Sequence, residues 1–495
     1  MPQCPFRRRV TNYASTVPAP LLRRTLSGRH DAAAVFDALY SRSVNAFWLD
    51  GGAHASSGMS YLGDSERVLE AVSWEALLDG IGIERGEGGP GILSPYSAAS
   101  APRFALGWVG WLGYELGVLG DVPSPGARAS VTPVATMMRV DRAVEIDHTT
   151  GATTLLALDR TGARSWLDTT TRILASLSAS SGRTRSLSDT EATDRAHSIA
   201  GGAREVRMRH GFDEYAALVE ECREVIRAGE AYQLCLTNAF EVEGGFDPVE
   251  VHRRLRASSP TAHGGLVRAG DTALVSASPE QFLTVSPSGV VTTRPVKGTR
   301  RRDPDPRRDR ELAAELAASD KEQAENLMIV DLMRNDLARV CELGSVGVTR
   351  LLEVESLPQV HQLVSTVEGR LREGLGAVDA LAACFPAGSM TGAPKLSAME
   401  HLARLEGAPR GVYSGAFGYL SDDGSAEFSM VIRSIVVTPG RATVGAGGGI
   451  TILSDPVAEV EETRLKAAAP LAALGAEVPP WPAPRIRSPR EHGGF

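Results

Sequence analysis

Short apolar runs separated by turn residues occupy the first third of the chain. Residues 47–49, 104–109 and 144–146 are such runs and predict strands, whereas Ala32–Leu39 has apolar residues at helical spacing. This part of the chain is therefore expected to consist mainly of strands and turns, with one early helix.

From residue 212 onward, helical and strand periodicities alternate. The pattern predicts a helix over 212–229, a strand over 232–241, a second helix over 247–256 and hairpins across 265–296. With 495 residues the chain is longer than one hydrophobic core usually fills. Two domains or one large composite fold are therefore expected.

Three segments lack sustained periodicity and set the expected boundaries. Residues 1–30 are rich in arginine and contain no acid, which favours a disordered leader over a transit peptide. Residues 177–205 are rich in Ser, Thr, Arg and Gly and predict a linker, and the Pro- and Arg-rich residues 476–495 predict a frayed tail. The sequence therefore predicts two folded parts, an N-terminal region over 31–176 and a larger domain over 206–475.

Composition narrows the functional class. The apolar fraction of 43% and the charged fraction of 23% are ordinary for a globular protein, and the net charge of −8 argues against general binding to nucleic acids or anionic membranes. No apolar run reaches membrane-spanning length. The five cysteines form no Cys-x-x-Cys pair and indicate idle or buried thiols in a reducing cytoplasm: Cys4, Cys222, Cys235, Cys341 and Cys384.

Two carboxylates open a predicted helix that runs to about residue 340. Glu322 shares its azimuth with the apolar residues Ile329 and Met333, and Glu325 lies nearby, so both extend the buried stripe. Buried carboxylates need a cation or an acid–base task. The alternative is an exposed first turn in which the acids favour the helix dipole, and the helix alone leaves both interpretations open.

A second acidic pair, Glu459 and Glu462, lies on a helix that Asp455 caps and Pro456 begins. Lys466 follows on the same face, so a surface ion pair is the simplest interpretation of this helix alone. Carboxylates from two helices, however, are what Mg²⁺ accepts while leaving room for an anionic ligand.

A glycine-rich run, Gly445-Ala-Gly-Gly-Gly449, follows a predicted strand over 441–444. After Ile450, the strand is predicted to continue at 451–453. Because no helix opens there, it is not a dinucleotide-binding loop. Glycines in a strand allow a ligand to approach the backbone, so the amides could hold a carboxylate. A bulge or a tight crossing of sheets is the structural alternative.

Several single residues are candidates for chemistry. Lys297 is expected at the end of a strand between Pro295 and Gly298, which favours a role as a reagent, and Glu280 projects from the stiff turn after Pro279. Arg433, in a predicted strand over 429–437, would ordinarily pair with an acid. His361 alone favours a satisfied core histidine, and Tyr413 either anchors a carboxylate or packs.

These segments, in this order, resemble the catalytic domain of the chorismate-binding enzymes, the anthranilate synthase component I and aminodeoxychorismate synthase component I family. The resemblance covers residues 210–470 and is looser upstream, at 60–64 and 110–115. It implies an α+β fold in which two antiparallel-rich sheets pack orthogonally with helices outside. The motifs are Ser278-Pro279-Glu280, residues 294–300, 322–336, 385–395, 410–418, 445–450 and 459–466.

The resemblance also implies site roles. Glu325 and Glu462 would bind Mg²⁺, with Glu322 and Glu459 behind them, and Lys297 and Glu280 would be the nucleophile and the general acid. The other implied residues surround chorismate: Tyr413, Arg433, Gly447, Gly448, Gly449 and Lys466 at its carboxylates, catalytic His361 and Thr391 around its ring, and Thr299 and Ser389 elsewhere in the site.

Two positions select a branch of the family. Members that add water carry a lysine base where this chain has Gln233, and anthranilate synthases typically have alanine where it has Lys297. The resemblance therefore implies amination of chorismate at C4 to 4-amino-4-deoxychorismate, for 4-aminobenzoate formation. Anthranilate synthase component I is the alternative enzyme, and a non-catalytic chorismate- or tryptophan-binding subunit is an alternative of another class.

No segment resembles a Cys-His-Glu amidotransferase. Ammonia is therefore expected from a separate glutamine amidotransferase subunit (component II) or from solution.

Overall fold

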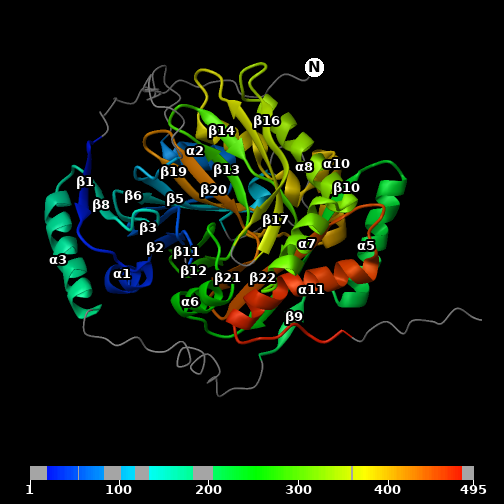
Figure 1. Ribbon diagram of the computed structural model, residues 1–495, viewed down its shortest axis with the longest axis horizontal. Helices are drawn as coiled ribbons and strands as arrows, with labels where there is room; N and C mark the ends of the chain where they lie inside the picture. The colour runs from blue at the N-terminus through cyan, green and yellow to red at the C-terminus, as the bar shows by residue number, and fades with distance from the viewer. Residues whose placement is uncertain are drawn as a thin grey trace, which may run out of the picture.

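Two large antiparallel sheets dominate the computed structural model, which describes residues 19–53, 55–82, 102–117, 133–181, 204–357 and 360–481 (Figure 1). Sheet A runs in the order β1 (Leu21–Leu26), β8 (Thr153–Leu158), β7 (Arg142–Asp147), β3 (Met59–Asp64), β2 (Ala46–Asp50), β11 (Gly264–Ala269), β12 (Thr272–Ser276), β21 (Ser434–Thr438), β22 (Arg441–Ile450), β10 (Gln233–Glu243) and β18 (Gly392–Ala393), with β9 (Val206–Met208) beside β10.

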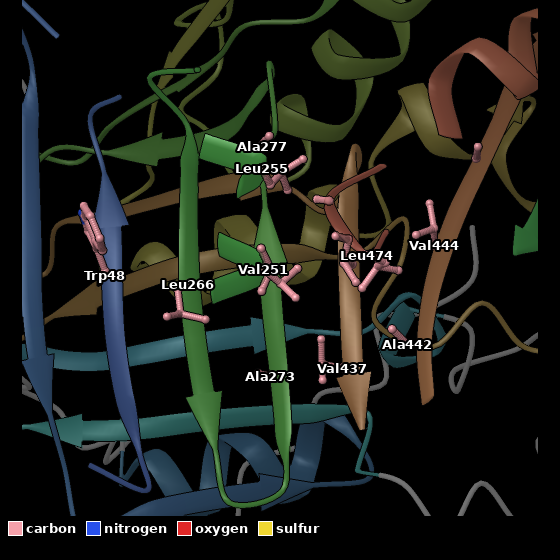
Figure 2. Packing of buried hydrophobic residues seen from close by; sticks show 14 of the residues in the cluster. Trp48, Val251, Leu255, Leu266, Ala273, Ala277, Val437, Ala442, Val444 and Leu474 are labelled. Carbon is pink, nitrogen blue, oxygen red and sulfur yellow. The ribbon is translucent and has the colours of Figure 1, made fainter. Parts of the chain in front are cut away.

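Sheet B crosses behind sheet A. Its order is β15 (Val296–Arg301), β17 (Val360–Arg370), β14 (Val290–Thr293), β13 (Gln281–Val285), β20 (Ala426–Met430), β19 (Ala416–Ser421), β5 (Gly107–Leu112), β6 (Ala135–Val140) and β4 (Val68–Ala71), with β16 (Gly347–Ser356) beside β17. Figure 2 shows strands of sheet A side by side and strands of the other sheet running across behind them. The predicted α+β fold with two crossed antiparallel sheets is confirmed.

Helices cover the outer faces of the sheets (Figure 1). They are α1 (Ala32–Leu39), α2 (Trp74–Ile81), α3 (Ala163–Ser181), α5 (Phe212–Arg227), α6 (Pro248–Ser258), α7 (Pro306–Ala317), α8 (Asp320–Ala338), α9 (Ala377–Cys384), α10 (Lys395–Glu406) and α11 (Pro456–Ala473), with short 3₁₀ turns η1 (Tyr114–Gly117) and η2 (Gly388–Met390). None of the helices in these described ranges is long and apolar enough to cross a membrane.

The two halves of the sequence form one composite fold. Strand β2 of the N-terminal half pairs with β11 of the larger half, and β5 pairs with β19. Both sheets therefore contain strands from 31–176 and from 206–475, so the boundary expected near residue 205 does not separate two bodies. The alternative of a single large composite fold is the one that the structure shows.

Parts of the segments expected to lack structure are ordered. Leu21–Leu26 form β1 and pair with β8, so the leader prediction is wrong for them, and α3 extends to Ser181 inside the predicted linker. In the predicted tail, Ala476 bridges Arg204, and the indole of Trp481 packs on Phe212 with ring centroids 6.0 Å apart. Residues 1–18, 182–203 and 482–495, which hold the rest of these predictions, lie outside the described residues.

The cores follow this layering. One apolar cluster fills the space between the sheets and includes Phe47 and Val267 from sheet A and Trp111 and Phe417 from sheet B. A larger cluster, part of which Figure 2 shows, joins the outer face of sheet A to α1, α5, α6 and α11. A third joins sheet B to α8 and α9. The four described cysteines are free and buried, as expected, and Cys4 lies outside the described residues.

We predict that Phe417→Ala destabilises the whole chain. Phe417 is 1% exposed, and its ring lies so close to β11 that a Cβ placed on Gly265 would be 3.1 Å from ring atom Cε2. Removing a ring from such a core costs about 3–5 kcal/mol. Guanidinium denaturation followed by fluorescence measures the loss. Leu453→Ala, at a residue that is 83% exposed, is the control, and equal stability of both variants would contradict the placement of this core.

Candidate active site

Two helices bring the predicted carboxylates together at the end of sheet A. Asp455 caps α11 by accepting a hydrogen bond from Ala458 N (2.9 Å), and Pro456 begins the helix, as predicted. Helix α11 packs along β22, so Glu459 and Glu462 face its glycine run. A Cβ placed on Gly448 would lie 2.8 Å from Glu459 Oε2, so a side chain at this position would displace the carboxylate.

Burial differs among the four acidic residues. The side chains of Glu322 and Glu325 at the start of α8 are 19% and 13% exposed, and Glu459 is 4% exposed. The side chain of Glu462 is 47% exposed and forms the expected ion pair with Lys466. Burial raises the pKa of Glu325 and of Glu459, and each also feels the charge of Glu462. Carboxylates of α8 and α11 therefore share one partly desolvated cluster and do not lie on separate wet surfaces.

The donor set of this cluster fits a hard divalent cation. Among the described residues, no three His, Cys, Asp or Glu side chains stand in a ready-made metal-binding arrangement. Mg²⁺ needs fewer protein ligands, because it is usually held by one or two carboxylates together with waters and ligand oxygens. One carboxylate from each helix meets that requirement.

Lys297 lies beside the acidic cluster, within electrostatic reach of Glu325 and Glu462. It is the second residue of β15, so it begins a strand and does not end one as predicted, and its side chain is half-buried. Its charge is among the influences that shift the pKa of Glu280, Glu325, Glu462 and Cys235. The half-buried Lys297 amine is therefore within electrostatic reach of Glu280 and of carboxylates on both α8 and α11.

Glu280 is the carboxyl group whose pKa best suits a general acid. It lies in the turn between β12 and β13, where its carbonyl accepts a hydrogen bond from Met430 N (3.0 Å). Complete burial raises the pKa of Glu280 to about 7, against the opposing effects of the Lys297 charge and a hydrogen bond from Ser389. The group is therefore protonated below neutral pH and can give up its proton near pH 7.

The loop 385–394 contacts Glu280 through Ser389. Lys395 fixes the loop, because its amine donates to Asp336 Oδ2 (2.6 Å) and to Cys384 O (3.1 Å). Ser389 faces Glu280 from this loop, whereas the Thr391 hydroxyl donates back to Ala387 O (3.3 Å). The structure thus places Ser389 beside a catalytic candidate and Thr391 as an internal brace of the loop.

Arg433 and Tyr413 border the glycine run. Arg433 lies in the connection between β20 and β21 with φ of 51°, so the predicted continuous strand over 429–437 is wrong. Solvent reaches its guanidinium, yet the surrounding protein lowers the Arg433 pKa, against the effects of Tyr413 and Glu462. The Tyr413 ring covers Gly445, where a Cβ would lie 2.1 Å from ring atom Cγ.

The glycine run forms the last five residues before the end of β22 at Ile450, and a turn follows, so the predicted continuation of the strand at 451–453 is wrong. Lys466 donates to Gly447 O (2.7 Å) and pairs with Glu462 Oε1 (2.6 Å). The buried amide of Gln233 packs over Gly449, where a Cβ would lie 2.1 Å from its Nε2. Along the run, Tyr413 thus lies against Gly445, Lys466 against Gly447 and Gln233 against Gly449.

His361 lies on β17, and Thr299 lies on the neighbouring strand β15. His361 is buried, and its Nδ1 and Nε2 lie 2.8 Å from Ser356 Oγ and 3.0 Å from Asp309 Oδ1. Both ring nitrogens are thus engaged within the protein. Thr299 is exposed on β15, in register with Gln362. Their assigned roles stay predictions.

Sequence reasoning missed a buried ion pair that joins these pieces. Arg410 donates to both carboxylate oxygens of Glu406 (2.6 and 2.8 Å), to Met390 O (2.7 Å) and to Cys235 O (2.8 Å). Glu115 of the N-terminal half accepts hydrogen bonds from Arg410 N (2.7 Å) and Gly411 N (3.0 Å). Arg410 therefore ties the loop of Ser389, β10 and the segment of Tyr413 together. The only signal was that Glu115 and Arg410 lie in quoted motifs.

Comparison with known proteins defines the class. The model of the family described as chorismate binding enzyme matches residues 82–472, and the chain belongs to this family.

Its relatives include two kinds of synthase. The chain is 40% identical to the aminodeoxychorismate synthase of Streptomyces pristinaespiralis over 90% of its own length and 64% of that protein, so it spans slightly less than two thirds of this relative. It is 39% identical to anthranilate synthase component 1 of Streptomyces coelicolor, over 75% of this chain and 73% of the relative. Anthranilate synthase component I from Streptococcus pneumoniae TIGR4 has a similar structure, with a TM-score of 0.63, 26% identity and coverage of 94% and 95%.

We predict that Glu280 makes stability fall as pH rises towards neutrality. Its pKa is about 7 in the folded chain against 4.5 for an ordinary glutamate, so the folded state retains a proton that the unfolded state has lost. The free energy of unfolding of the wild type, relative to Glu280→Gln, should therefore decrease by roughly 3 kcal/mol between about pH 4.5 and pH 7. Urea denaturation of both proteins across this range measures the difference, and a constant difference would refute the raised pKa.

Proposed function

We propose that this chain is the chorismate-aminating part of an aminodeoxychorismate synthase. The observation that carries the proposal is a half-buried Lys297 amine within electrostatic reach of Glu280, whose pKa lies near 7, and of carboxylates on α8 and α11. A nucleophile and an acid so placed can replace the C4 hydroxyl of chorismate by an amino group.

The groups around the glycine run suit a dicarboxylate. Arg433 and Lys466 supply positive charge, Tyr413 supplies a hydroxyl, and the backbone of Gly447–Gly449 allows close approach. Charge-assisted hydrogen bonds of this kind hold carboxylates firmly and in a defined orientation. Chorismate, which carries two carboxylates, matches this arrangement.

Mg²⁺ would be held by Glu325 and Glu462, with Glu322 and Glu459 behind them. When bound, the ion offsets the negative charge of the substrate and fixes the orientation of its ring.

In the proposed reaction, the Lys297 ammonium first gives its proton to the Glu280 carboxylate, and the resulting uncharged amine attacks C2 of chorismate and forms a C–N bond. The ring double bonds shift, and the C4 hydroxyl leaves as water with a proton from Glu280. Ammonia then attacks C4, the double bonds shift back, and the C2–N bond to Lys297 breaks. The product, 4-amino-4-deoxychorismate, keeps its enolpyruvyl ether, and two allylic steps replace one difficult displacement.

Ammonia would come from a glutamine amidotransferase partner. The aminodeoxychorismate synthase of S. pristinaespiralis is longer than this chain, which spans 64% of it. A glutaminase activity is therefore proposed for a subunit or segment beyond the residues that carry the chorismate site. Delivery by such a partner avoids dependence on the concentration of free ammonia.

Anthranilate synthase component I is the second candidate function, favoured by the 39% identity to the S. coelicolor enzyme. That reaction places nitrogen at C2 and releases pyruvate. Lys297 beside the cleft favours C4 amination instead, because a resident amine at C2 blocks attack by ammonia there.

We predict the product from chorismate, Mg²⁺ and ammonium with purified protein. Mass spectrometry should identify 4-amino-4-deoxychorismate, with no fluorescent anthranilate and no pyruvate. Anthranilate and pyruvate as direct products would replace the first function by the second. Chorismate binding without turnover under excess ammonium would favour a non-catalytic subunit.

We predict that Lys297→Ala reduces amination by about a hundredfold or more while chorismate affinity stays measurable. The substitution removes the attacking amine, but the groups proposed to hold the carboxylates remain. Turnover and calorimetric binding of chorismate give the two quantities. Arg301→Ala, at an exposed residue of the same strand, is the matched control. Wild-type turnover in Lys297→Ala would remove Lys297 from the mechanism.

A further inference from the structure

Lysine is rare in this chain, and all four lysines lie at or beside the candidate active site. Among 52 Lys and Arg residues, only Lys297, Lys321, Lys395 and Lys466 are lysines. An ammonium group is a compact point charge, and a planar guanidinium does not replace it in a confined site. We therefore consider what an ammonium group does at each of these four positions. Lys321 is the one of the four without a role so far.

Lys321 lies at the edge of the acidic cluster, in the first turn of α8. Its Nζ is 3.8 Å from Glu325 Oε1, and its side chain is 53% exposed. The carboxylates of Glu459, Glu462 and Glu322 also attract this ammonium. One flexible ammonium is thus within electrostatic reach of all four carboxylates that the proposed function assigns to Mg²⁺.

The acidic cluster needs a cation whether or not a metal is bound. Glu322 and Glu462 both repel the charge of Glu325, and Glu462 repels that of Glu459. Like charges in a partly desolvated site destabilise the fold unless they are neutralised.

The neighbouring lysine is held differently. Lys466 is fixed by two short contacts, to Glu462 and to Gly447 O, at 2.6 and 2.7 Å. Lys321 has a single longer contact with the cluster, and half of its side chain reaches solvent. Of the two, Lys321 is the cation that can leave without breaking a short hydrogen bond.

We propose that Lys321 is the exchangeable counter-cation of this cluster: it neutralises the carboxylates before Mg²⁺ binds and yields its place to the ion. The inference rests on the proposed function, because it takes these four carboxylates as the metal site. Once a divalent ion is present, its charge repels the ammonium, and the four-carbon stem lets the amine turn into solvent. Exchange of one cation for another keeps the cluster neutralised throughout.

The test compares Lys321→Gln with Arg334→Gln, both studied after treatment with EDTA and without chorismate. Arg334 is a matched control on the same helix, since it is 52% exposed and has one ion pair, to Asp331 at 3.3 Å. Two quantities are measured for each protein: the thermal unfolding temperature in EDTA, and the Kd for Mn²⁺, used as the probe ion, by calorimetry.

Lys321→Gln should unfold at a lower temperature than Arg334→Gln in EDTA, and added Mn²⁺ should abolish the difference. Its Kd for Mn²⁺ should be lower than that of the wild type by about three- to tenfold, because a competing charge is gone. Lys321→Arg should bind Mn²⁺ more weakly than Lys321→Gln, since it restores a competing charge. If both Gln variants match the wild type in stability and in Kd, the exchange role is refuted. If the wild type binds no Mn²⁺, the exchange falls together with the metal site, whereas product identification still tests the amination independently.

Discussion

Mutual neutralisation of neighbouring ionisable groups, several of them buried, is the constraint on which this structure depends. Glu280 is buried so completely that its proton is retained to about pH 7, even with the charge of Lys297 acting against retention. Four carboxylates from α8 and α11 lie nearby, and Lys297, Lys321 and Lys466 provide the opposing charge. Loss of one of these cations leaves a buried or half-buried carboxylate without compensation, which couples the chemistry of the cleft to the stability of the fold.

The scaffold holds these groups in place from several directions. Lys395 and Asp336 join α10 to α8 and fix the ends of the loop that carries Ser389. Arg410 and Glu406 connect that loop to β10, and Glu115 connects both to the N-terminal half. A buried ion pair with this many hydrogen bonds is costly to break on one side. The N-terminal half is thus part of the support of the site, although none of its residues is assigned to chorismate.

Local patterns predicted the elements that carry the site. Helical periodicity placed Glu322 and Glu325 near the buried stripe of α8, and Asp455 and Pro456 marked the start of α11 correctly, because capping and periodicity act within one or two turns. Spacing therefore placed the acidic residues on one face of each helix but left open whether they are buried. Which of its members bind metal was an inference from family resemblance.

Longer-range features could not be predicted in this way. The pairing of β2 with β11 joins residues about two hundred positions apart, and neither strand carries a local signal of its partner. Likewise, the pair Arg410–Glu406 matters through contacts with β10 and η1 that only the assembled fold creates. The left-handed backbone at Arg433 broke a run that has the composition of one continuous strand. Ordered residues 21–26 looked like a leader because a strand at the edge of a sheet needs little apolar content.

The central claim is that a resident primary amine adds to the ring before ammonia does. Intact-protein mass spectrometry after mixing with chorismate and Mg²⁺, in the absence of any ammonia source, tests this addition directly. The account predicts a species heavier than the free chain by one chorismate less one water, with peptide mapping that places the added mass on Lys297. An unmodified chain under conditions that support turnover, or added mass on another residue, would contradict it.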